Sequence, residues 1–352
     1  MPSAQAIEGC LLGTAIGDAL GLPFENLSSR RALRMFGPPG RFCFVFGRGM
    51  VSDDTEHACM TAQALIAPAD DDSAFRQQLA LQLRRWLVML PAGTGMATAR
   101  ATIKLLVGVP PHRSGVFSAG NGPAMRSPIL GAAIDDIDVL KRFVRISTRM
   151  THTDPKAEYG ALAVALATQC ASRGVHNEPA RFAQALAELL VNQPAEEFLD
   201  LVNRAVDSAN RDESAATFAR SLGLGRGVSG YIYHTVPVVL QSWFRNQHDF
   251  RAAICDVIAC GGDTDSTAAI LGGIVGAAVG KDGLPAEWLK GLWEWPRSAK
   301  WIENLAAELY AVRATGVGRR PPRLPVWGVV PRNLLFLAVV LFHGFRRLLP
   351  PY

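Results

Sequence analysis

Apolar residues recur at helical spacing along most of the chain, and this pattern predicts an all-α fold. Positions three and four residues apart are apolar in many alanine-rich segments, whereas convincing alternating strands are nearly absent. We expect a compact, orthogonal multi-helix globule that forms one domain over residues 1–315. The expected helices cover residues 56–67, 73–90, 130–150, 156–173, 179–191, 195–208, 234–245, 250–259, 266–280 and 298–313.

Two of the expected helices carry a stripe of glycines on one face. A glycine inside a helix costs about 1 kcal/mol relative to alanine, so several together indicate that a neighbouring helix approaches closely and recovers the loss. We expect these two helices to be central. The stripes consist of Gly9, Gly13, Gly17 and Gly21 in the first helix, and of Gly272, Gly273, Gly276 and Gly280 in the second.

Two polar segments rich in glycine and proline interrupt the helical pattern, at about residues 26–51 and 107–128. Both are longer than ordinary connections between helices, and loops of that length in compact domains are usually functional. They are candidates for lining a pocket.

Residues 316–352 differ in composition from the rest and are predicted to form a linker plus a hydrophobic C-terminal helix. Their longest apolar run, Leu334–Phe342, is nine residues, well short of the roughly 20 needed to span a bilayer. One interpretation is a terminal helix that docks on the domain or on a second subunit. The other is a peripheral membrane helix in the interface, anchored by Arg346 and Arg347.

Charge and cysteine content exclude several classes of protein. The net charge of +5 comes from 36 basic and 31 acidic side chains spread along the chain, so no nucleic acid partner is expected. The six cysteines show no CxxC spacing, which is typical of reduced thiols. No secretory signal is recognisable at the N-terminus. We therefore expect a cytoplasmic protein.

Two acidic segments, each at the start of an expected helix, carry the candidate chemistry. The first contains Ser52, Asp53 and Asp54, and the second contains Asp263, Asp265 and Ser266. Helix capping alone would explain one acid at each start, and Asp53 with Glu56 has the spacing of a capping box.

Each segment, however, offers two carboxylates with a hydroxyl beside them. If the segments meet, four carboxylates face one another, and such a group needs a counterion to stay ionised. Oxygen ligands alone favour Mg²⁺, Mn²⁺ or Ca²⁺ over zinc. Six such residues suit a pair of cations bridged by a carboxylate.

With these segments and three others, the chain resembles the ADP-ribosylglycohydrolase family, which includes the dinitrogenase reductase-activating glycohydrolase and the ADP-ribosylarginine hydrolases. The resemblance covers about residues 6–310 and rests on motifs that occur in order. These are "GCLLGTAIGDALGLPFE" (9–25), "SDDTEHA" (52–58), "GNGPAMR" (120–126), "THTDPKAEYGALAVA" (151–165) and "GGDTDSTAAILGGIVGA" (261–277). The family usually has threonine where this chain has Ser52, which keeps the hydroxyl oxygen.

The resemblance implies a hydrolase that removes ADP-ribose from a modified protein side chain, with arginine as the favoured acceptor. Two divalent cations, Mg²⁺ or Mn²⁺, would sit under the distal ribose, orient its hydroxyls and activate a water. Their ligands would be Ser52, Asp53, Asp54, Asp263, Asp265 and Ser266. Asp54 or Asp265 would serve as the base, and Glu25, on a loop near the metals, is the other candidate for proton transfer.

The resemblance also implies a substrate-binding set. Gly120 and Gly122 would let backbone N–H groups approach the pyrophosphate, with Asn121 adding an amide. Met125 belongs to the same motif, and Arg126 is a candidate phosphate partner or a solvated loop residue. His152 is placed in the substrate pocket, although a packed or capping histidine is an equal alternative. Tyr231 or Tyr233 would form an aromatic wall for the adenine or would pack in the core.

Two other functions remain open from the sequence. A relative that binds ADP-ribose without turnover would keep the fold, but its acidic motifs would be expected to decay, and here they are intact. A metal-dependent phosphohydrolase acting on a nucleotide could use the same cations, but the ordered motifs favour the glycohydrolase. The acceptor could also be serine, an ester or a nucleic acid.

Overall fold

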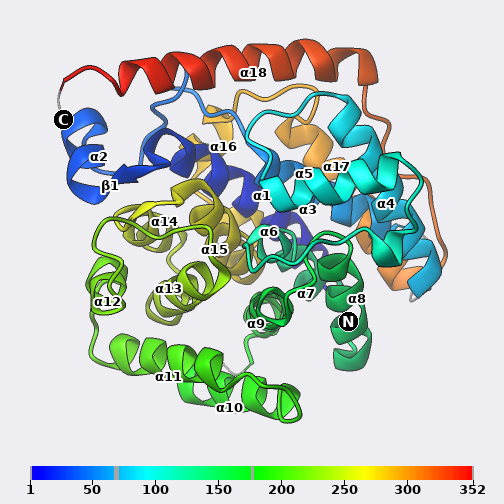
Figure 1. Ribbon diagram of the computed structural model, residues 1–352, viewed down its shortest axis with the longest axis horizontal. Coiled ribbons are helices and arrows are strands. Elements are labelled where there is room, and N and C mark those ends of the chain that lie inside the picture. The colour runs from blue at the N-terminus through cyan, green and yellow to red at the C-terminus, as the bar shows by residue number, and fades with distance from the viewer. Residues whose placement is uncertain (1, 67–70, 176–177, 351–352) are drawn as a thin grey trace.

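A computed structural model describes residues 2–66, 71–175 and 178–350. These residues form an all-α globule, as predicted, with one small sheet (Figure 1). The first half contains α1 (Ala4–Gly21), η1 (Leu22–Phe24), β1 (Leu27–Ser28), α2 (Ser29–Phe36), α3 (Asp53–Leu65), α4 (Asp72–Val88), α5 (Met96–Leu106), η2 (Pro111–Arg113), α6 (Gly122–Met125), α7 (Pro128–Ala133), α8 (Ile137–Arg149) and α9 (Pro155–Arg173). The second half contains α10 (Pro179–Leu189), α11 (Glu196–Asn210), α12 (Ala215–Ser221), α13 (Ile232–Arg245), α14 (Phe250–Ile258), β2 (Gly261–Gly262), α15 (Thr264–Val279), η3 (Lys281–Gly283), α16 (Ala286–Gly291), α17 (Ala299–Thr315) and α18 (Val326–Arg346).

Helices α1 and α15 lie at the centre and touch through their glycine stripes, as the sequence predicted. A methyl group added at Gly13 would lie 2.2 Å from the carbonyl oxygen of Gly272, and one added at Gly17 would lie 2.0 Å from that of Ala268. At the end of α1, a methyl group on Gly21 would lie 2.2 Å from the carbonyl oxygen of Thr264. The two backbones therefore pack in direct contact, and only glycine fits at these positions.

The other helices surround this pair. In Figure 1, α10 and α11 lie at the bottom of the molecule and α18 lies along the top, with α1 and α15 between them. The sheet consists of β1 and β2, which pair antiparallel with Leu27 opposite Gly262. This pairing joins the turn that follows α1 to the segment that precedes α15.

The helix boundaries differ from the predicted ones at particular polar residues. The expected helix over 130–150 is broken between α7 and α8, where Ile134 is extended and the Asp136 carboxylate accepts hydrogen bonds from the N–H groups of Asp138 and Val139. Helices α5 and α12 were not predicted. Helix α2 lies inside the predicted loop 26–51, and α6 inside the predicted loop 107–128.

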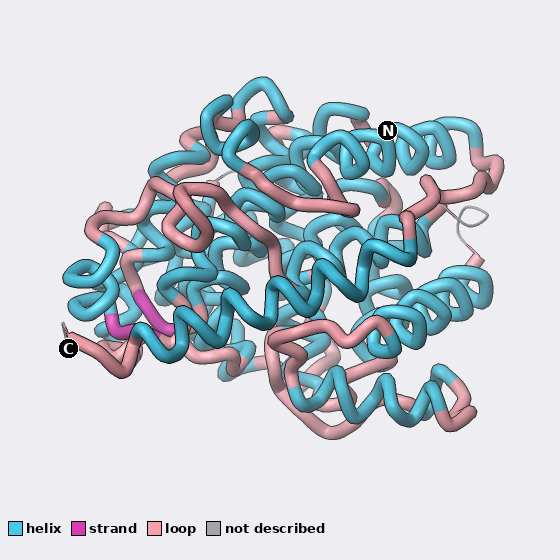
Figure 2. Tube along the Cα trace, turned by 90° about the horizontal axis from the view of Figure 1, so that it is seen from above, coloured by secondary structure: helices cyan, strands magenta, loops and turns pink. Residues whose placement is uncertain are grey.

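Two helical segments of the described residues are long and apolar enough to cross a membrane by length and composition. Ala4–Phe24 is the central helix with its short extension, and 94% of its apolar window is buried in the protein. The other segment is α18, of which 33% is buried. Figure 2 looks down on α18, which crosses the surface as one long helix. It docks on the domain through one face, as one of the two interpretations of the sequence expected.

Candidate active site

The two acidic segments meet in space. Asp53 and Asp54 begin α3, and Asp265 and Ser266 lie in the first turn of α15. The hydroxyl of Ser266 donates to the carboxylate of Asp54 over 3.2 Å. The hydroxyl of Ser52 donates to the same oxygen, Oδ2, at 3.2 Å. The structure therefore brings together hydroxyls and carboxylates from both segments, although they are more than 200 residues apart.

Capping accounts for only part of this arrangement. Ser52 is the N-cap of α3, because its hydroxyl accepts from the backbone N–H of Asp54 at 3.3 Å. The capping-box interpretation of Glu56 is wrong. Its carboxylate accepts from the indole N–H of Trp86 and from Arg297, each at 2.6 Å, in a buried ion pair. The aspartates beside Ser52 are therefore left for another role.

Burial and mutual repulsion raise the pKa values of the clustered carboxyls. Burial, followed by the charge of Asp53, raises the pKa of Asp54 well above its usual range. Burial, followed by the charge of Glu25, does the same for Asp265. The pKa values of Asp53 and Asp263 are also raised, again mainly by burial. The site is therefore short of positive charge.

Unpartnered oxygens mark where a cation would bind. Among the described residues, Oδ1 of Asp54 and Oδ1 of Asp265 are buried and have no hydrogen-bond partner. Buried oxygens of this kind are rare in proteins unless they serve a ligand or ion. With all-oxygen donors beside them, the chemistry fits a hard divalent cation. As the side chains stand, no group of three Asp, Glu, His or Cys in the described ranges is arranged to hold a metal ion, so a bound cation would require these side chains to reorient.

Glu25 lies at the rim of this cluster because of the small sheet. It follows η1 directly, and the next residue, Asn26, donates its backbone N–H to the carbonyl oxygen of Gly262 at 2.7 Å. Burial, followed by the charge of Asp263, raises the pKa of Glu25. Gly262 itself has φ +84°, and a methyl group there would lie 2.0 Å from the carbonyl oxygen of Val228. This glycine therefore lets the two strands and the acidic segment converge.

The glycine-rich loop borders the cluster through Asn121. Its amide nitrogen donates to Asp263 at 2.6 Å and to the hydroxyl of Thr235 at 3.1 Å. The backbone N–H of Asn121 donates to the carbonyl oxygen of Gly230 at 2.9 Å. The side chain thus links the loop to the acidic site, a contact that the sequence did not predict.

His152 lies directly under the same loop. Methyl groups added at Gly120 or Gly122 would come within 3.1 Å of its ring. The ring is only 3% exposed, and burial lowers the pKa of His152 to about 3. The histidine is therefore neutral and packed, and it supports the two glycines that were predicted to bind substrate.

Arg126 and Met125 are buried below this loop. The guanidinium of Arg126 is completely buried and donates to Ser147 Oγ, to the Ser147 carbonyl oxygen and to the Thr151 hydroxyl. It also donates to the carbonyl oxygen of Gly122, in the loop itself, at 3.1 Å. The prediction that Arg126 contacts a phosphate is wrong, because its guanidinium is completely buried and bonded within the protein. Met125 is 4% exposed and belongs to the hydrophobic core, so its predicted contact with substrate would require movement.

The two tyrosines have different environments. Tyr233 is buried and stacks on Phe198 with ring centroids 5.0 Å apart, so it packs in the core. Tyr231 is half-buried and its backbone lies beside Gly120. Of the two, Tyr231 is the one that remains available as an aromatic wall.

Asp18 is a site residue that the sequence analysis missed. It lies in α1, is fully buried, and accepts from the backbone N–H of Ser52 with both oxygens at 3.0 and 2.9 Å. It also accepts from the hydroxyl and backbone N–H of Thr55. Burial raises the pKa of Asp18 to about 6. Asp18 is the only charged residue in the segment 9–24, and an acid inside such an apolar run was the signal that could have revealed it.

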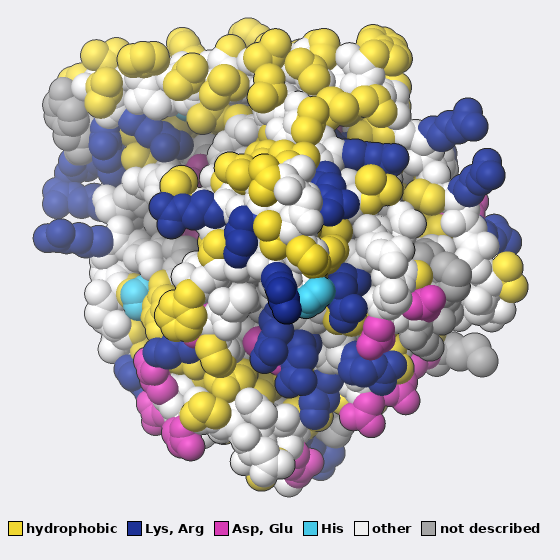
Figure 3. Space-filling model, turned by 45° about the vertical axis from the view of Figure 1, so that its right-hand side comes forward, with side chains coloured by type: hydrophobic (Ala, Val, Ile, Leu, Met, Phe, Trp, Pro, Cys, Tyr) yellow, Lys and Arg dark blue, Asp and Glu magenta, His cyan; other side chains and the backbone are white. Residues whose placement is uncertain are grey.

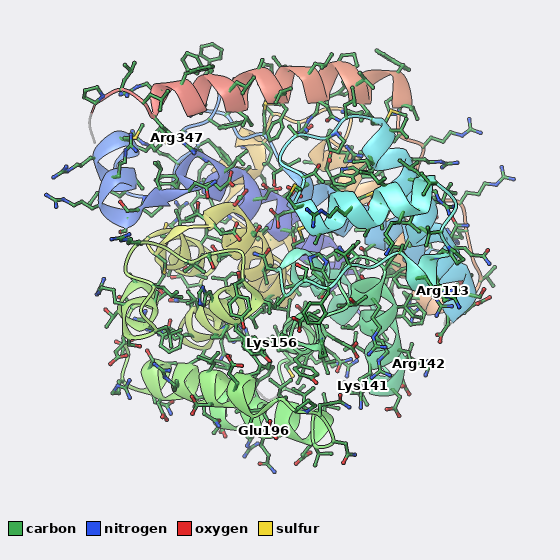
Figure 4. All side chains as sticks on the ribbon, in the orientation of Figure 1. Arg113, Lys141, Arg142, Lys156, Glu196 and Arg347 are labelled. Atoms are coloured by element: carbon green, nitrogen blue, oxygen red, sulfur yellow. The ribbon has the colours of Figure 1, made fainter. Side chains whose placement is uncertain are left out.

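The C-terminal helix also reaches the site. Arg347, at the end of α18, donates to the carbonyl oxygen of Pro23 at 3.2 Å. The charges of Glu25 and Asp265 act on the pKa of this guanidinium and partly offset the lowering caused by its burial. Figure 4 shows Arg347 below one end of α18, on the side of α2 and β1. Its guanidinium is thus directed into the protein, toward the acidic site.

Comparisons with known proteins agree with this geometry. The model of the ADP-ribosylglycohydrolase family matches residues 2–317. The chain therefore belongs to the ADP-ribosylglycohydrolase family, and it is a glycosyl hydrolase that acts on ADP-ribosyl groups.

Particular relatives cover most of the chain. ADP-ribosylhydrolase ARH3 of Gallus gallus is 25% identical over 88% of this chain and 94% of its own. The ADP-ribosyl-[dinitrogen reductase] glycohydrolase of Rhodospirillum rubrum is 26% identical over 81% of this chain and 89% of its own. A solved structure described as an ADP-ribosylglycohydrolase-related protein complex superposes with a TM-score of 0.61 at 25% identity, covering 88% of this chain and 98% of that one.

Proposed function

We propose that this enzyme removes ADP-ribose from modified arginine side chains of proteins, and that it depends on two divalent cations, Mg²⁺ or Mn²⁺. The bond cleaved is the one at the anomeric carbon of the distal ribose. The observation that carries the proposal is the convergence of Asp54 and Ser266, from segments at opposite ends of the domain, around buried oxygens that lack partners.

The cations would be held by the oxygens of both segments. Their ligands are Ser52, Asp53, Asp54, Asp263, Asp265 and Ser266. When bound, such a pair supplies the positive charge that this site lacks, orients ribose hydroxyls and lowers the pKa of water. Carboxylate repulsion in the protein alone supports this assignment, because it makes cation binding favourable.

Different carboxyl groups of the protein are proposed to carry out the two proton transfers, from the attacking water and to the departing nitrogen. Asp54 and Asp265 are the candidate bases for the attacking water, since each has a free buried oxygen. Glu25 is the candidate for proton transfer to the departing nitrogen in this scheme, because it lies at the rim of the cluster, where burial and the charge of Asp263 raise its pKa. Gly120 and Gly122 position the pyrophosphate, with His152 packed beneath them.

Arginine is preferred over serine as the acceptor on electrostatic grounds. A guanidinium is cationic, and the charge of Asp263 reaches the rim of the site, where it acts on Glu25. A neutral hydroxyl acceptor would gain nothing from this charge.

The test is to incubate the full chain with arginine-linked and serine-linked ADP-ribosylated proteins, with and without Mg²⁺ or Mn²⁺, and to measure free ADP-ribose. We expect metal-dependent release from the arginine linkage. Asp54→Asn should abolish it, whereas Asp138→Asn, at an acid in the first turn of α8, should not. Faster release of ADP-ribose from serine than from arginine would overturn the acceptor assignment. Equal release with metal and with chelator would overturn the proposed metal dependence.

A further inference from the structure

Helix α18 presents two chemically different faces. Its inner face is fixed by polar contacts: Arg332 forms a buried ion pair with Glu294 at 2.6 Å, and Asn333 donates to the carbonyl oxygen of Met89 at 2.8 Å. The ring of His343 stacks on Phe44, with centroids 4.7 Å apart, and its Nε2 lies 2.7 Å from the Phe44 carbonyl oxygen. The helix is therefore docked in one fixed rotational setting, which determines which residues point outward.

The outer face is a continuous apolar strip. Its large side chains are 51–77% exposed: Trp327, Leu334, Leu335, Leu341, Phe342 and Phe345. The exposed Pro331 and Ala338 fill the intervals between them, so that an apolar residue recurs every three or four positions. Leu348 and Leu349 extend it past the end of the helix at 69% and 58% exposure. Figure 3 shows hydrophobic side chains gathered along the top of the molecule, over α18. Single exposed apolar residues are ordinary on soluble proteins, but a contiguous strip of this length marks a binding surface.

An apolar recess adjoins the strip. Its volume is about 280 Å³, and it is lined by Met50, Trp293, Trp295, Pro331 and Leu335 together with the ion pair of Glu294 and Arg332. Trp295 also packs against Trp327, with ring centroids 5.1 Å apart. The strip thus continues sideways onto the domain and is not confined to the helix.

The flanks of the strip are cationic. Residues 316–352 contain six arginines and neither aspartate nor glutamate. Arg332 and Arg347 are bonded within the protein and Arg319 pairs with Glu308, so the arginines that flank the strip on this segment are Arg320, Arg323 and Arg346. Near the C-terminal end of α18 lies α2, whose Arg31 donates to the carbonyl oxygen of Arg347. Helix α2 carries the exposed Arg30 and Arg34 on the same segment. A strip with Trp and Phe at its ends and arginines at its flanks is typical of a helix that lies in a membrane interface.

We propose that α18 binds the surface of a membrane that contains anionic lipids, with its outer strip among the acyl chains and the flanking arginines at the headgroups. The charge at the strip selects lipid over a second copy of the chain. In a two-fold dimer these arginines would face one another, and residues 316–352 offer no acid to pair them.

The docking is testable by flotation of the full chain with phosphatidylcholine vesicles and with vesicles of phosphatidylcholine and phosphatidylglycerol. We expect the protein to float with the anionic vesicles, and much less with the neutral ones. Leu341→Asp should abolish flotation, because it buries a charge in the strip. Val191→Asp is the matched control, since Val191 is 75% exposed and follows α10 on the opposite side of the molecule (Figure 1). It should float like the wild type.

A second variant tests the contribution of the cationic flank to membrane binding. Arg30→Gln with Arg34→Gln should weaken binding about fivefold per arginine at low salt, and melting temperatures should show that every variant is folded. Failure to float with either vesicle would overturn the proposal. So would a dimer in sedimentation that Leu341→Asp dissociates, which would assign the strip to a second copy. Flotation that survives high salt and alkaline carbonate would instead indicate a spanning helix.

Discussion

The hydroxyl of Ser266 lies 3.2 Å from the carboxylate of Asp54, although 212 residues separate them in the chain. This contact joins the first turns of α3 and α15, so two N-terminal helix ends, each bearing acids, face the same space. Helix N-termini favour negative charge, but they do not neutralise several carboxylates buried together. The cluster is therefore unstable on its own and suited to bind cations.

Removing one of these charges should stabilise the metal-free protein. The pKa of Asp54 is raised in the fold, so its contribution to stability is present at low pH and is lost as the pH rises through the folded pKa. In chelator at pH about 8, Asp54→Asn should therefore unfold at a higher temperature than the wild type. The difference should shrink as the pH falls, because Asp54 then becomes protonated in the wild type.

A divalent cation should make the wild type more stable than Asp54→Asn, which reverses the order expected in chelator. Mg²⁺ or Mn²⁺ should raise the melting temperature of the wild type by mass action, and Asp54→Asn should lose most of the increase. The same melting curves with and without cation measure both effects. A cation-induced increase that is equal in the two proteins would contradict the assignment of Asp54 as a ligand.

Asp18 should be required for the geometry of α3. Asp18→Asn keeps the shape of the side chain but turns an N–H₂ group toward the donors of Ser52 and Thr55. We expect the free energy of unfolding to fall by about 1–3 kcal/mol and kcat to fall with it. The control is Asp136→Asn, at the N-cap of α8, where asparagine caps as well as aspartate. Similar losses in both variants would argue against a special role for Asp18.

The glycine contact between the central helices should tolerate no side chain. Gly13→Ala places a methyl group 2.2 Å from the carbonyl oxygen of Gly272, and we expect a loss of about 3 kcal/mol or more in urea unfolding. Gly344→Ala is the matched control, because no atom lies within 4 Å of its added methyl group. It should stabilise the protein by up to about 1 kcal/mol.

Arg126 should behave as a structural residue. Arg126→Lys loses several buried hydrogen bonds to Ser147 and Thr151, and we expect a fall of about 3 kcal/mol in the free energy of unfolding. KM for the ADP-ribosylated substrate should stay near the wild-type value. Arg113→Lys, at an exposed arginine of the same loop region labelled in Figure 4, should alter neither quantity. A large rise in KM with unchanged stability would restore the phosphate-binding role.

The sequence predicted the parts of the fold that depend on local pattern. Long amphipathic or alanine-rich segments were placed within a few residues, and the glycine stripes indicated the central pair of helices because glycine in a helix is costly unless packing requires it. The short α2 and α6 were missed, since their glycine- and proline-rich surroundings conceal one or two helical turns. The break at Ile134 depends on contacts with α9, including the Gln169 amide donating to its carbonyl oxygen at 2.8 Å.

Site residues were predictable where their chemistry is unusual in sequence. Paired acids beside hydroxyls stand out, whereas Asp18 is hidden among apolar residues and its importance comes from a tertiary contact. Arg126 shows the opposite error. An arginine next to a glycine-rich loop suggests an anion site, and only the fold shows that its guanidinium points inward.

Helix α1 sets the spacing of the active site. Asp18 holds the start of α3, while one turn later Gly21 lies against Thr264 at the start of α15. Helix α1 alone therefore sets the distance between the two acid-bearing helices, α3 and α15. The distance between the two helix starts, where the proposed cations and ribose would bind, is consequently fixed by Asp18 and Gly21, and the bare glycine backbone lets α1 and α15 lie close enough together.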